Sequence, residues 1–288
     1  TQLRNSLQLF IECLDGWTAP ADAFVTLHAA DQHAFWLDRE HSVDDRFSVV
    51  GSGLPASLDD LSFSSAPLEV PFASRPGLVG VFGYESKHDA FLAVDRALVF
   101  DHERRKIWFI GFFATEAAFR HWLQAALLRL ALVGGETAAY RNLNSGSTLK
   151  NPRLRHSPSR YLELIEVAQR HIAAGDVYQL CLTNEITAEG EADPLEVFLR
   201  LRALNPTPYS AYLKFGDRVV VSTSPEQFLR VTADGWVSSK PIKGTRRRDA
   251  DPIKDAELAV ELAENVKERA ENLMIVDLMR NDIGQVCD

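Results

Sequence analysis

Short runs in which apolar and polar residues alternate dominate the first 114 residues and predict strands. The segments "AFVTLHA" (23–29) and "HAFWLD" (33–38) alternate with period two, and the polar residues between them predict a hairpin connection. Further apolar runs of strand length lie at 46–53, 77–85 and 105–114. Gly80 and Gly83 interrupt the run at 77–85, which indicates a bulge or a close approach of two backbones.

Helical spacing of apolar residues appears in longer segments. From Thr115 to Gly134 apolar residues recur three and four positions apart, with Thr115 as the expected N-cap and Gly134 as the expected end. A second helix is predicted from Ser157 to Gly175, with Pro158 in its first turn if Ser157 is the cap. A third helical pattern covers most of 251–282, as one helix or two consecutive ones.

Residues 135–156 separate two halves of the chain. This segment has little apolar periodicity and is rich in Asn, Ser, Gly and Pro, which is typical of a boundary or a long connection. We therefore predict an amino-terminal domain over 1–134 and the first part of a second, incomplete domain over 157–288. The second half has strand patterns at 176–189, 209–216, 218–224 and 235–240, with more hairpins than crossovers. The whole pattern predicts an α+β fold of layered mixed or antiparallel sheets flanked by helices.

The charge and the cysteines restrict the partners and the compartment. The formal net charge is −9, so we expect no nucleic acid and no anionic membrane surface as a partner, because both require a basic protein surface. No apolar run reaches the ~20 residues of a membrane helix. The three cysteines are far apart and form no CxxC motif, which predicts neither disulfides nor a zinc site and agrees with a reducing cytoplasm. The missing initiator Met and the abrupt end at "RNDIGQVCD" indicate a fragment or a processed chain.

Two short motifs of the second half carry residues suited to acid–base and nucleophilic chemistry, whereas common phosphate-binding, GxSxG and HExxH motifs are absent. Glu226 follows an apolar strand in "STSPEQF", where a carboxylate is a turn cap, a solvated group or a general acid. Lys243 ends another strand-like segment in "PIKGT". If the strands before Glu226 and Lys243 pair, an acid and an amine meet at one cavity, which suits addition–elimination chemistry.

The segment "RAENLMIVDLMRND" (269–282) places two carboxylates on different faces of a helix. Asp277 faces Arg280 one turn later, which predicts an ion pair. Glu271 has Lys267 one turn before it, but its neighbours one turn later are apolar. Glu271 is therefore either a second ion pair or a ligand of a hard divalent cation such as Mg²⁺.

Several motifs together resemble those of the chorismate-utilising enzymes. The most specific are "PIKGTRRR" (241–248) and the 16-residue "RAENLMIVDLMRNDIG" (269–284). The motifs "GLVGVFGYE", "GDVYQLCLTNE", "NPTPYSAYL" and "STSPEQF" fit the same family in the same order. The resemblance extends from about residue 24 to the end and implies a fold like that of anthranilate synthase component I.

Two positions distinguish the branches of that family. The anthranilate synthase large subunit typically reads "PIAGT", with alanine where this chain has Lys243. The isochorismate and salicylate synthases carry a water-activating lysine where this chain has Gln179. The combination resembles the large component of aminodeoxychorismate synthase, an enzyme of para-aminobenzoate and folate biosynthesis.

The resemblance implies a reaction in which an amino group replaces the C4 hydroxyl of chorismate. Lys243 would be the nucleophile, Glu226 the general acid and later the base, and Glu271 one ligand of a catalytic Mg²⁺. Gly244, Thr245 and Gln179 would contact the substrate. Ammonia would come from a glutaminase subunit or a fused glutaminase domain.

Three arginines follow the lysine motif and have two interpretations. Arg246, Arg247 and Arg248 could guide a dianionic substrate, but a solvated basic run is the favoured interpretation.

The resemblance leaves two alternative functions open and predicts that the chain lacks part of the family's active site. The alternatives are an anthranilate synthase large component and a non-catalytic docking module for a glutaminase. Members of the family continue beyond "RNDIG" with further metal-binding and carboxylate-binding residues that this chain does not show. We therefore expect the chain on its own to be inactive toward chorismate.

Overall fold

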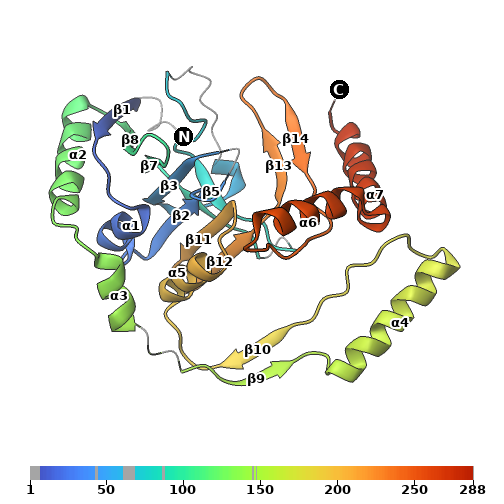
Figure 1. The fold of residues 1–288 in the computed structure, drawn as a ribbon. Coiled ribbons are helices and arrows are strands. Elements are labelled where there is room, and N and C mark those ends of the chain that lie inside the picture. The colour runs from blue at the N-terminus through green and yellow to red at the C-terminus, as the bar shows by residue number, and fades with distance from the viewer. Residues whose placement is uncertain are drawn as a thin grey trace. The chain divides into compact units, whose positions relative to one another are not determined.

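The structure, a computed structural model, describes residues 7–287 except 43–44, 61–68, 86–87, 145 and 147. Its contacts divide the chain into two compact units, one formed by residues 1–136 together with 198–288 and the other by residues 137–197. The elements of both units are labelled in Figure 1. The division of the sequence at residues 134 and 156 stays a prediction.

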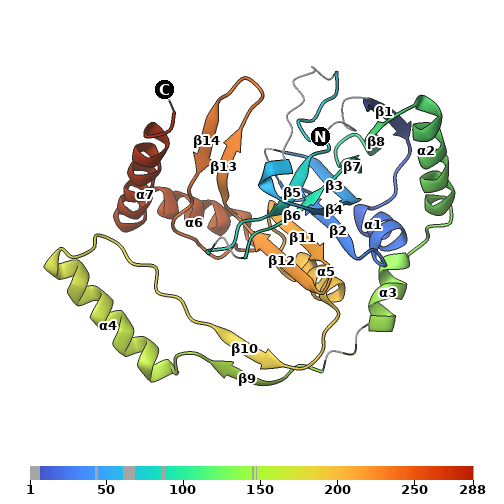
Figure 2. The ribbon, with the colours of Figure 1, turned by 180° about the vertical axis from the view of Figure 1, so that it is seen from behind.

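A seven-stranded antiparallel sheet forms the centre of the larger unit. Its strands are, in spatial order, β1 (Gln8–Asp15), β8 (Lys106–Phe113), β7 (Arg96–Asp101), β3 (Phe47–Ser52), β2 (His33–Asp38), β11 (Tyr209–Phe215) and β12 (Arg218–Ser224). The strand β11 pairs with β2 so that Ser210 lies opposite Asp38, and Figures 1 and 2 both show the two strands side by side. One sheet therefore combines strands from the beginning of the chain with strands from its last third.

A small second sheet packs against one face of the large one. It consists of β4 (Leu54–Ala56), β6 (Ala90–Ala93) and β5 (Leu78–Val81), and a short 3-10 helix spans Leu58–Asp60. Leu92 of β6 joins Phe35, Val99 and Ile110 of the large sheet in one buried cluster. A Cβ atom added at Gly80 would lie 2.3 Å from the carbonyl oxygen of Ala90, which confirms the close backbone approach that the sequence predicts.

Helices cover the opposite face of the large sheet. They are α1 (Pro20–His28), α2 (Glu116–Leu130) and α5 (Pro194–Leu204). The Trp36 ring on this face lies 5.6 Å from the Phe24 ring of α1 and 5.1 Å from the Phe198 ring of α5. The predicted helix after Thr115 is confirmed, because the Thr115 side chain accepts a hydrogen bond from the Ala118 N–H. This layered arrangement of antiparallel sheets and helices confirms the predicted α+β class.

The prediction of a strand over residues 23–29 is wrong, because α1 occupies most of this segment. Pro20 stands in the first turn of the helix, where its missing N–H costs no intrahelical hydrogen bond. The buried residues are Pro20, Ala21, Ala23, Phe24 and Leu27. Their spacing of three and four positions forms one helical face, and the alternation within 23–29 hid it.

A buried ion pair connects α5 to the large sheet. Arg202 Nε donates to Asp38 Oδ2 over 2.6 Å, and Ser48 Oγ donates to Asp38 Oδ1 over 3.0 Å. The Asp38 residue is 1% exposed. The Arg202 guanidinium also pairs with Glu40 and lies 5.1 Å from the centre of the Trp36 ring. Because a carboxylate is buried only with partners, this contact fixes α5 on the sheet.

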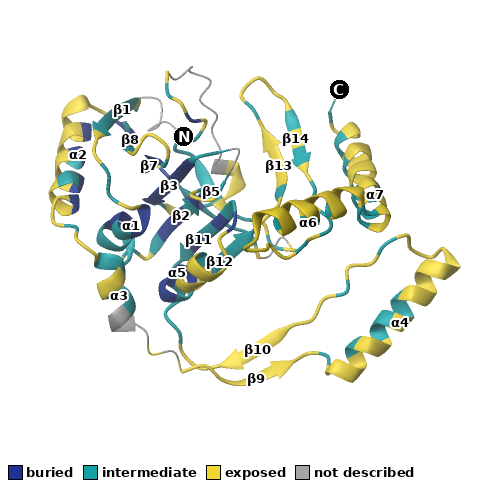
Figure 3. Ribbon diagram, viewed as in Figure 1, coloured by how far each residue is buried: buried dark blue, intermediate teal, exposed yellow. Residues whose placement is uncertain are grey.

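The last part of the larger unit is a hairpin followed by two helices. The hairpin is formed by β13 (Gln227–Val231) and β14 (Val237–Lys240), and the helices are α6 (Pro252–Glu264) and α7 (Val266–Gly284). Asn265 lies between the two helices and caps α7 through its side chain. In the described part of these helices no residue is buried, and Figure 3 shows the contrast with the dark strands of the large sheet. No described helix is both long and apolar enough to cross a lipid bilayer.

In its described residues the smaller unit contains two helices, the first residues of α5 and a two-stranded sheet. Its elements are α3 (Glu136–Asn144), β9 (Lys150–Leu154), α4 (Pro158–Ala174) and β10 (Ile186–Glu189), with β9 and β10 antiparallel. The helix α4 confirms its prediction, since Ser157 caps it and Gly175 ends it with a φ of 78°. The predicted strand over 176–189 forms only at its end, as β10. Residues 135–156 are not a plain connection, because α3 and β9 lie within them.

Candidate functional site

Glu226 and the segment of Lys243 meet at one end of the β13–β14 hairpin. The pairing places Gln227 at the start of β13 opposite Lys240 at the end of β14. The residues just outside this pair are therefore neighbours, and the Ile242 N–H donates to Glu226 Oε1 over 3.2 Å. The pairing that would have brought these residues together according to the sequence, between the strands before Glu226 and Lys243, does not form. Of these two strands, β12 belongs to the large sheet and β14 pairs with β13.

A serine turn holds the backbone at Glu226. The Glu226 N–H donates to Ser224 Oγ over 3.3 Å, and Ser224 Oγ donates to the Glu226 carbonyl oxygen over 3.2 Å. The Glu226 residue is exposed. Its carboxylate is therefore accessible to a bound molecule and oriented by the Ile242 amide. A carboxylate placed in this way can exchange a proton with a molecule within hydrogen-bonding distance.

Lys243 is half-buried and lies between the exposed Ile242 and the half-buried Gly244. Among the described residues, its ammonium nitrogen has no hydrogen-bond or ion-pair partner. Its neighbour Ile242 is 46% exposed and therefore gives the lysine little apolar burial. Within the described part of the chain, the lysine ammonium group is therefore available to contact a bound molecule.

Gly244 packs directly against the helix α7. Its φ is 79°, in the left-handed region that glycine adopts without strain. A Cβ atom at this position would lie 2.6 Å from Glu268 Oε2 and 3.1 Å from Glu268 Cβ. The backbone angle therefore favours glycine after Lys243, and a side chain there would also require the Glu268 side chain to move. Thr245 follows and is exposed.

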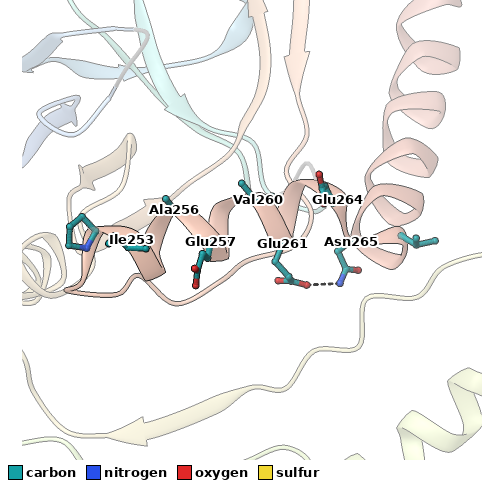
Figure 4. A pocket seen from close by; sticks show the side chains of 9 residues that line it. Ile253, Ala256, Glu257, Val260, Glu261, Glu264 and Asn265 are labelled. Carbon is teal, nitrogen blue, oxygen red and sulfur yellow. Dashed lines mark hydrogen bonds between the residues drawn. The ribbon is translucent and has the colours of Figure 1, made fainter.

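Arg246 joins the lysine motif to both helices. Its Nη2 donates to Glu261 Oε1 of α6 over 3.0 Å and its Nη1 donates to Glu268 Oε1 of α7 over 3.0 Å. The Nε atom also donates to Glu261, and Nη1 donates to the Thr245 carbonyl oxygen over 2.8 Å. Hydrogen bonds from Arg246 and from Asn265 lower the pKa of Glu261 to about 2. Figure 4 shows the bond between Glu261 and Asn265 along α6.

The interpretation of the three arginines as a solvated run is wrong for Arg246, whereas the Arg248 side chain is 89% exposed despite its ion pair. The Arg246 side chain is 24% exposed and carries the contacts to Glu261 and Glu268. Arg248 forms two hydrogen bonds of 2.7 Å with Asp255 of α6, which raise the pKa of Arg248 and lower that of Asp255. Arg247 is exposed, as expected. The local sequence could not show these contacts, since the carboxylates lie 7 to 22 positions later in the chain.

The described residues provide one carboxylate for the predicted Mg²⁺ rather than a complete site. Glu271 Oε1 lies 3.5 Å from the Lys267 ammonium nitrogen, so the predicted ion pair of Glu271 is present. No group of three or more His, Cys, Asp or Glu residues that could hold a metal ion occurs in the described parts of the chain. A magnesium site requires more oxygen ligands than Glu271 supplies. The second predicted pair, between Arg280 and Asp277, is confirmed at 3.0 Å.

An open apolar groove runs along α6. Figure 4 shows the side chains that line it, which include Ile253, Ala256 and Val260 with Glu257 and Glu264 beside them. The groove does not include Lys243 or Glu226.

Comparison with known proteins decides the family. The sequence profile of the chorismate binding enzymes matches residues 56–288, which include the hairpin, the lysine motif and both helices described above. The chain belongs to the chorismate-binding enzyme family. This result confirms the family that the sequence motifs indicate.

Relatives in this family carry more than one name. The chain is 42% identical over 238 residues to an aminodeoxychorismate synthase of Streptomyces pristinaespiralis, a match that covers 76% of the chain and 33% of that protein. It is 34% identical to aminodeoxychorismate synthase component 1 of Klebsiella aerogenes, covering 74% of the chain and 48% of the relative. The crystal structure of anthranilate synthase component I from Streptococcus pneumoniae superposes with a TM-score of 0.65 at 25% identity, over 85% of the chain and 63% of that structure. The chain thus spans between about a third and a half of these two curated relatives.

Gln179, the remaining candidate residue, lies in the smaller unit between α4 and β10. Its Oε1 atom is buried and has no hydrogen-bond partner among the described residues. A buried acceptor without a donor is uncommon and requires an explanation. The predicted role of Gln179 at the substrate stays a prediction, because Lys243 belongs to the other unit.

Proposed function

We propose that this chain is part of the large component of an aminodeoxychorismate synthase, which converts chorismate and ammonia to 4-amino-4-deoxychorismate. The observation that carries the proposal is the meeting of Glu226 with the Lys243 motif at one end of the β13–β14 hairpin. The relatives named aminodeoxychorismate synthase support it. The proposed compartment is the cytoplasm, and the proposed class is that of transferases of nitrogenous groups.

In the proposed reaction Lys243 is a covalent catalyst. Its neutral amine forms a bond to C2 of chorismate, the two ring double bonds shift, and the C4–O bond breaks. Glu226 gives its proton to the departing hydroxyl, which leaves as water. Ammonia then forms a bond to C4, the double bonds shift back, and the bond between C2 and the lysine nitrogen breaks. Glu226 takes the surplus proton from the new amino group, so both residues return to their starting states.

Other residues of the chain are proposed to bind rather than to react. Gly244 and Thr245 follow Lys243 in the turn and would contact the substrate, and Gln179 is proposed as a further substrate contact. We propose Glu271 as one ligand of Mg²⁺ in the whole protein, where the ion would stabilise negative charge on the substrate. Glu271 alone is not a metal site, since a magnesium ion needs further oxygen ligands. Since the described residues supply so little of such a site, the 288-residue chain alone is proposed to be inactive.

The proposed partner is a glutaminase, as a separate subunit or as a fused domain, that delivers ammonia. Product analysis of the whole protein tests the reaction itself. With chorismate and ammonium salt, mass spectrometry should find 4-amino-4-deoxychorismate, and Lys243→Ala should abolish its formation while Lys240→Ala should not. Release of anthranilate would contradict the proposal and favour anthranilate synthase, with which the chain also shares its fold. No binding of chorismate by calorimetry would favour the docking module.

A further inference from the structure

Arg246 is the cation of a network that contains two helices and the turn after Lys243. Beyond the bonds from its guanidinium to Glu261 and Glu268, the network continues through Asn265. The Asn265 Nδ2 donates to Glu261 Oε1 over 2.9 Å, and the Glu268 N–H donates to Asn265 Oδ1 over 3.2 Å. The end of α6, the start of α7 and the turn are therefore held by one connected set of hydrogen bonds.

Glu268 has a contact on each side of this turn. One carboxylate oxygen, Oε1, accepts from Arg246, while the other, Oε2, would lie 2.6 Å from a Cβ atom added at Gly244. The Glu268 side chain is 14% exposed, so this carboxylate is more protected from water than the Glu261 carboxylate at 49%. A partly buried ion pair is less screened by solvent than a surface pair. The Glu268 contact should therefore be the stronger constraint on the turn.

We propose that Arg246 is a positioning residue, which acts through Glu268 and Glu261 to fix the turn that presents Lys243. The inference rests on the proposed function, because it assigns Lys243 as the residue to be positioned. Arg246 itself does not react. With Glu226 holding the Ile242 N–H on one side and Glu268 packed against Gly244 on the other, Lys243 lies between two fixed points.

The geometry of the network requires arginine rather than any cation. The guanidinium of Arg246 donates from Nε and Nη2 to the two oxygens of Glu261 and from Nη1 to Glu268. A planar guanidinium offers these donors in fixed directions, whereas a lysine ammonium is a point charge on a flexible stem. Arg246→Lys should therefore keep the charge but lose part of the constraint.

The test uses the whole protein with four variants, one of them Arg246→Lys, and one control. Arg246→Gln and Glu268→Gln remove the contact from either side, and the double variant removes it from both. The control is Arg248→Gln, two positions later. The Arg248 side chain is 89% exposed, and its partner Asp255 lies in the first turn of α6. Hydrogen–deuterium exchange of the amides of residues 242–248 reports the turn directly, and kcat and KM for chorismate with ammonium salt report its effect.

Each single variant should speed exchange in 242–248 and lower kcat by about tenfold, with a smaller change in KM, as expected for loss of one partly exposed charged hydrogen bond. The double variant should be no worse than Arg246→Gln alone, because Arg246→Gln already removes the contact to Glu268. Arg246→Lys should recover part of kcat. The control should match the unaltered protein.

The results that would overturn the inference differ from those that would overturn the function. Unchanged exchange in Arg246→Gln, or faster exchange with unchanged kcat, would contradict the positioning role, as would an equal loss in Arg248→Gln. If the protein forms anthranilate instead, the proposed function fails, but the exchange and kcat of these variants still decide whether Arg246 fixes the turn. If the protein turns over no substrate, the rate at which an amine-acylating reagent modifies Lys243 replaces kcat as the readout. In that case, faster exchange in Arg246→Gln with an unchanged acylation rate of Lys243 would contradict the positioning role.

Discussion

The buried pair between Asp38 and Arg202 provides a sharp test of the fold. Arg202→Met removes the guanidinium but keeps a long apolar side chain beside Trp36. The Asp38 carboxylate, 1% exposed, would then retain the bond from Ser48 and lose the 2.6 Å bond from Arg202 Nε. Breaking a buried pair by removing one partner costs about 3–5 kcal/mol.

The lower end of that range applies here, because the Arg202 side chain is 18% exposed and the Glu40 side chain 43% exposed, so water screens part of the network. We expect a loss of about 3 kcal/mol in the free energy of unfolding. At a urea dependence of about 2 kcal/mol per M, the midpoint of urea unfolding falls by roughly 1.5 M. Far-ultraviolet circular dichroism in urea measures this shift, with intrinsic tryptophan fluorescence as a second probe.

The matched control is Arg280→Met, which removes another Arg–Asp pair in the same unit. The side chains of Arg280 and Asp277 are 80% and 57% exposed, so the expected loss is below about 0.5 kcal/mol. Adding Asp38→Asn to Arg202→Met should restore part of the stability, because the uncompensated charge disappears. Two results would refute the reasoning. One is an Arg202→Met protein whose free energy of unfolding is no lower than that of Arg280→Met. The other is a double variant whose loss equals the sum of the losses of Arg202→Met and Asp38→Asn measured separately.

Three further predictions concern other parts of the chain. Gly244→Ala should lower the free energy of unfolding by about 1–2 kcal/mol in urea titrations, because a side chain at a φ of 79° is strained and meets Glu268; an unchanged midpoint would contradict this. The pKa of Glu261 is lowered from 4.5 to about 2, so its contribution is present in full above pH 4.5 and is lost as the pH falls toward 2. The destabilisation by Glu261→Gln, measured in urea, should therefore shrink between pH 4.5 and 2, and a penalty independent of pH would exclude this cause. Burial raises the pKa of Cys13, whereas Cys181 is exposed, so iodoacetamide at pH 8 should modify Cys181 first in a mass-spectrometric time course; equal rates would contradict the burial of Cys13.

Local signals in the sequence determined the elements whose ends are chemically marked. Thr115 and Ser157 each cap a helix with a side-chain oxygen, and Gly175 ends α4 in the left-handed conformation, so these boundaries could be derived without a structure. The motifs around Lys243 and Glu226 could also be recognised from the sequence, because they are contiguous and because their residue types are specific to one family of enzymes.

Tertiary structure decided the contacts between residues far apart in the chain. Residues 23–29 alternate like a strand, but the burial of Pro20, Phe24 and Leu27 on one side makes them helical. The pairing of Ser210 with Asp38 joins two distant parts of the chain, and nothing in either strand specifies the other. The partners of Arg246 likewise lie on two helices that follow it. Caps and turns depend on a few neighbouring residues, whereas strand pairing and ion pairs depend on which surfaces remain exposed after the rest of the chain has packed, and only the folded chain determines that.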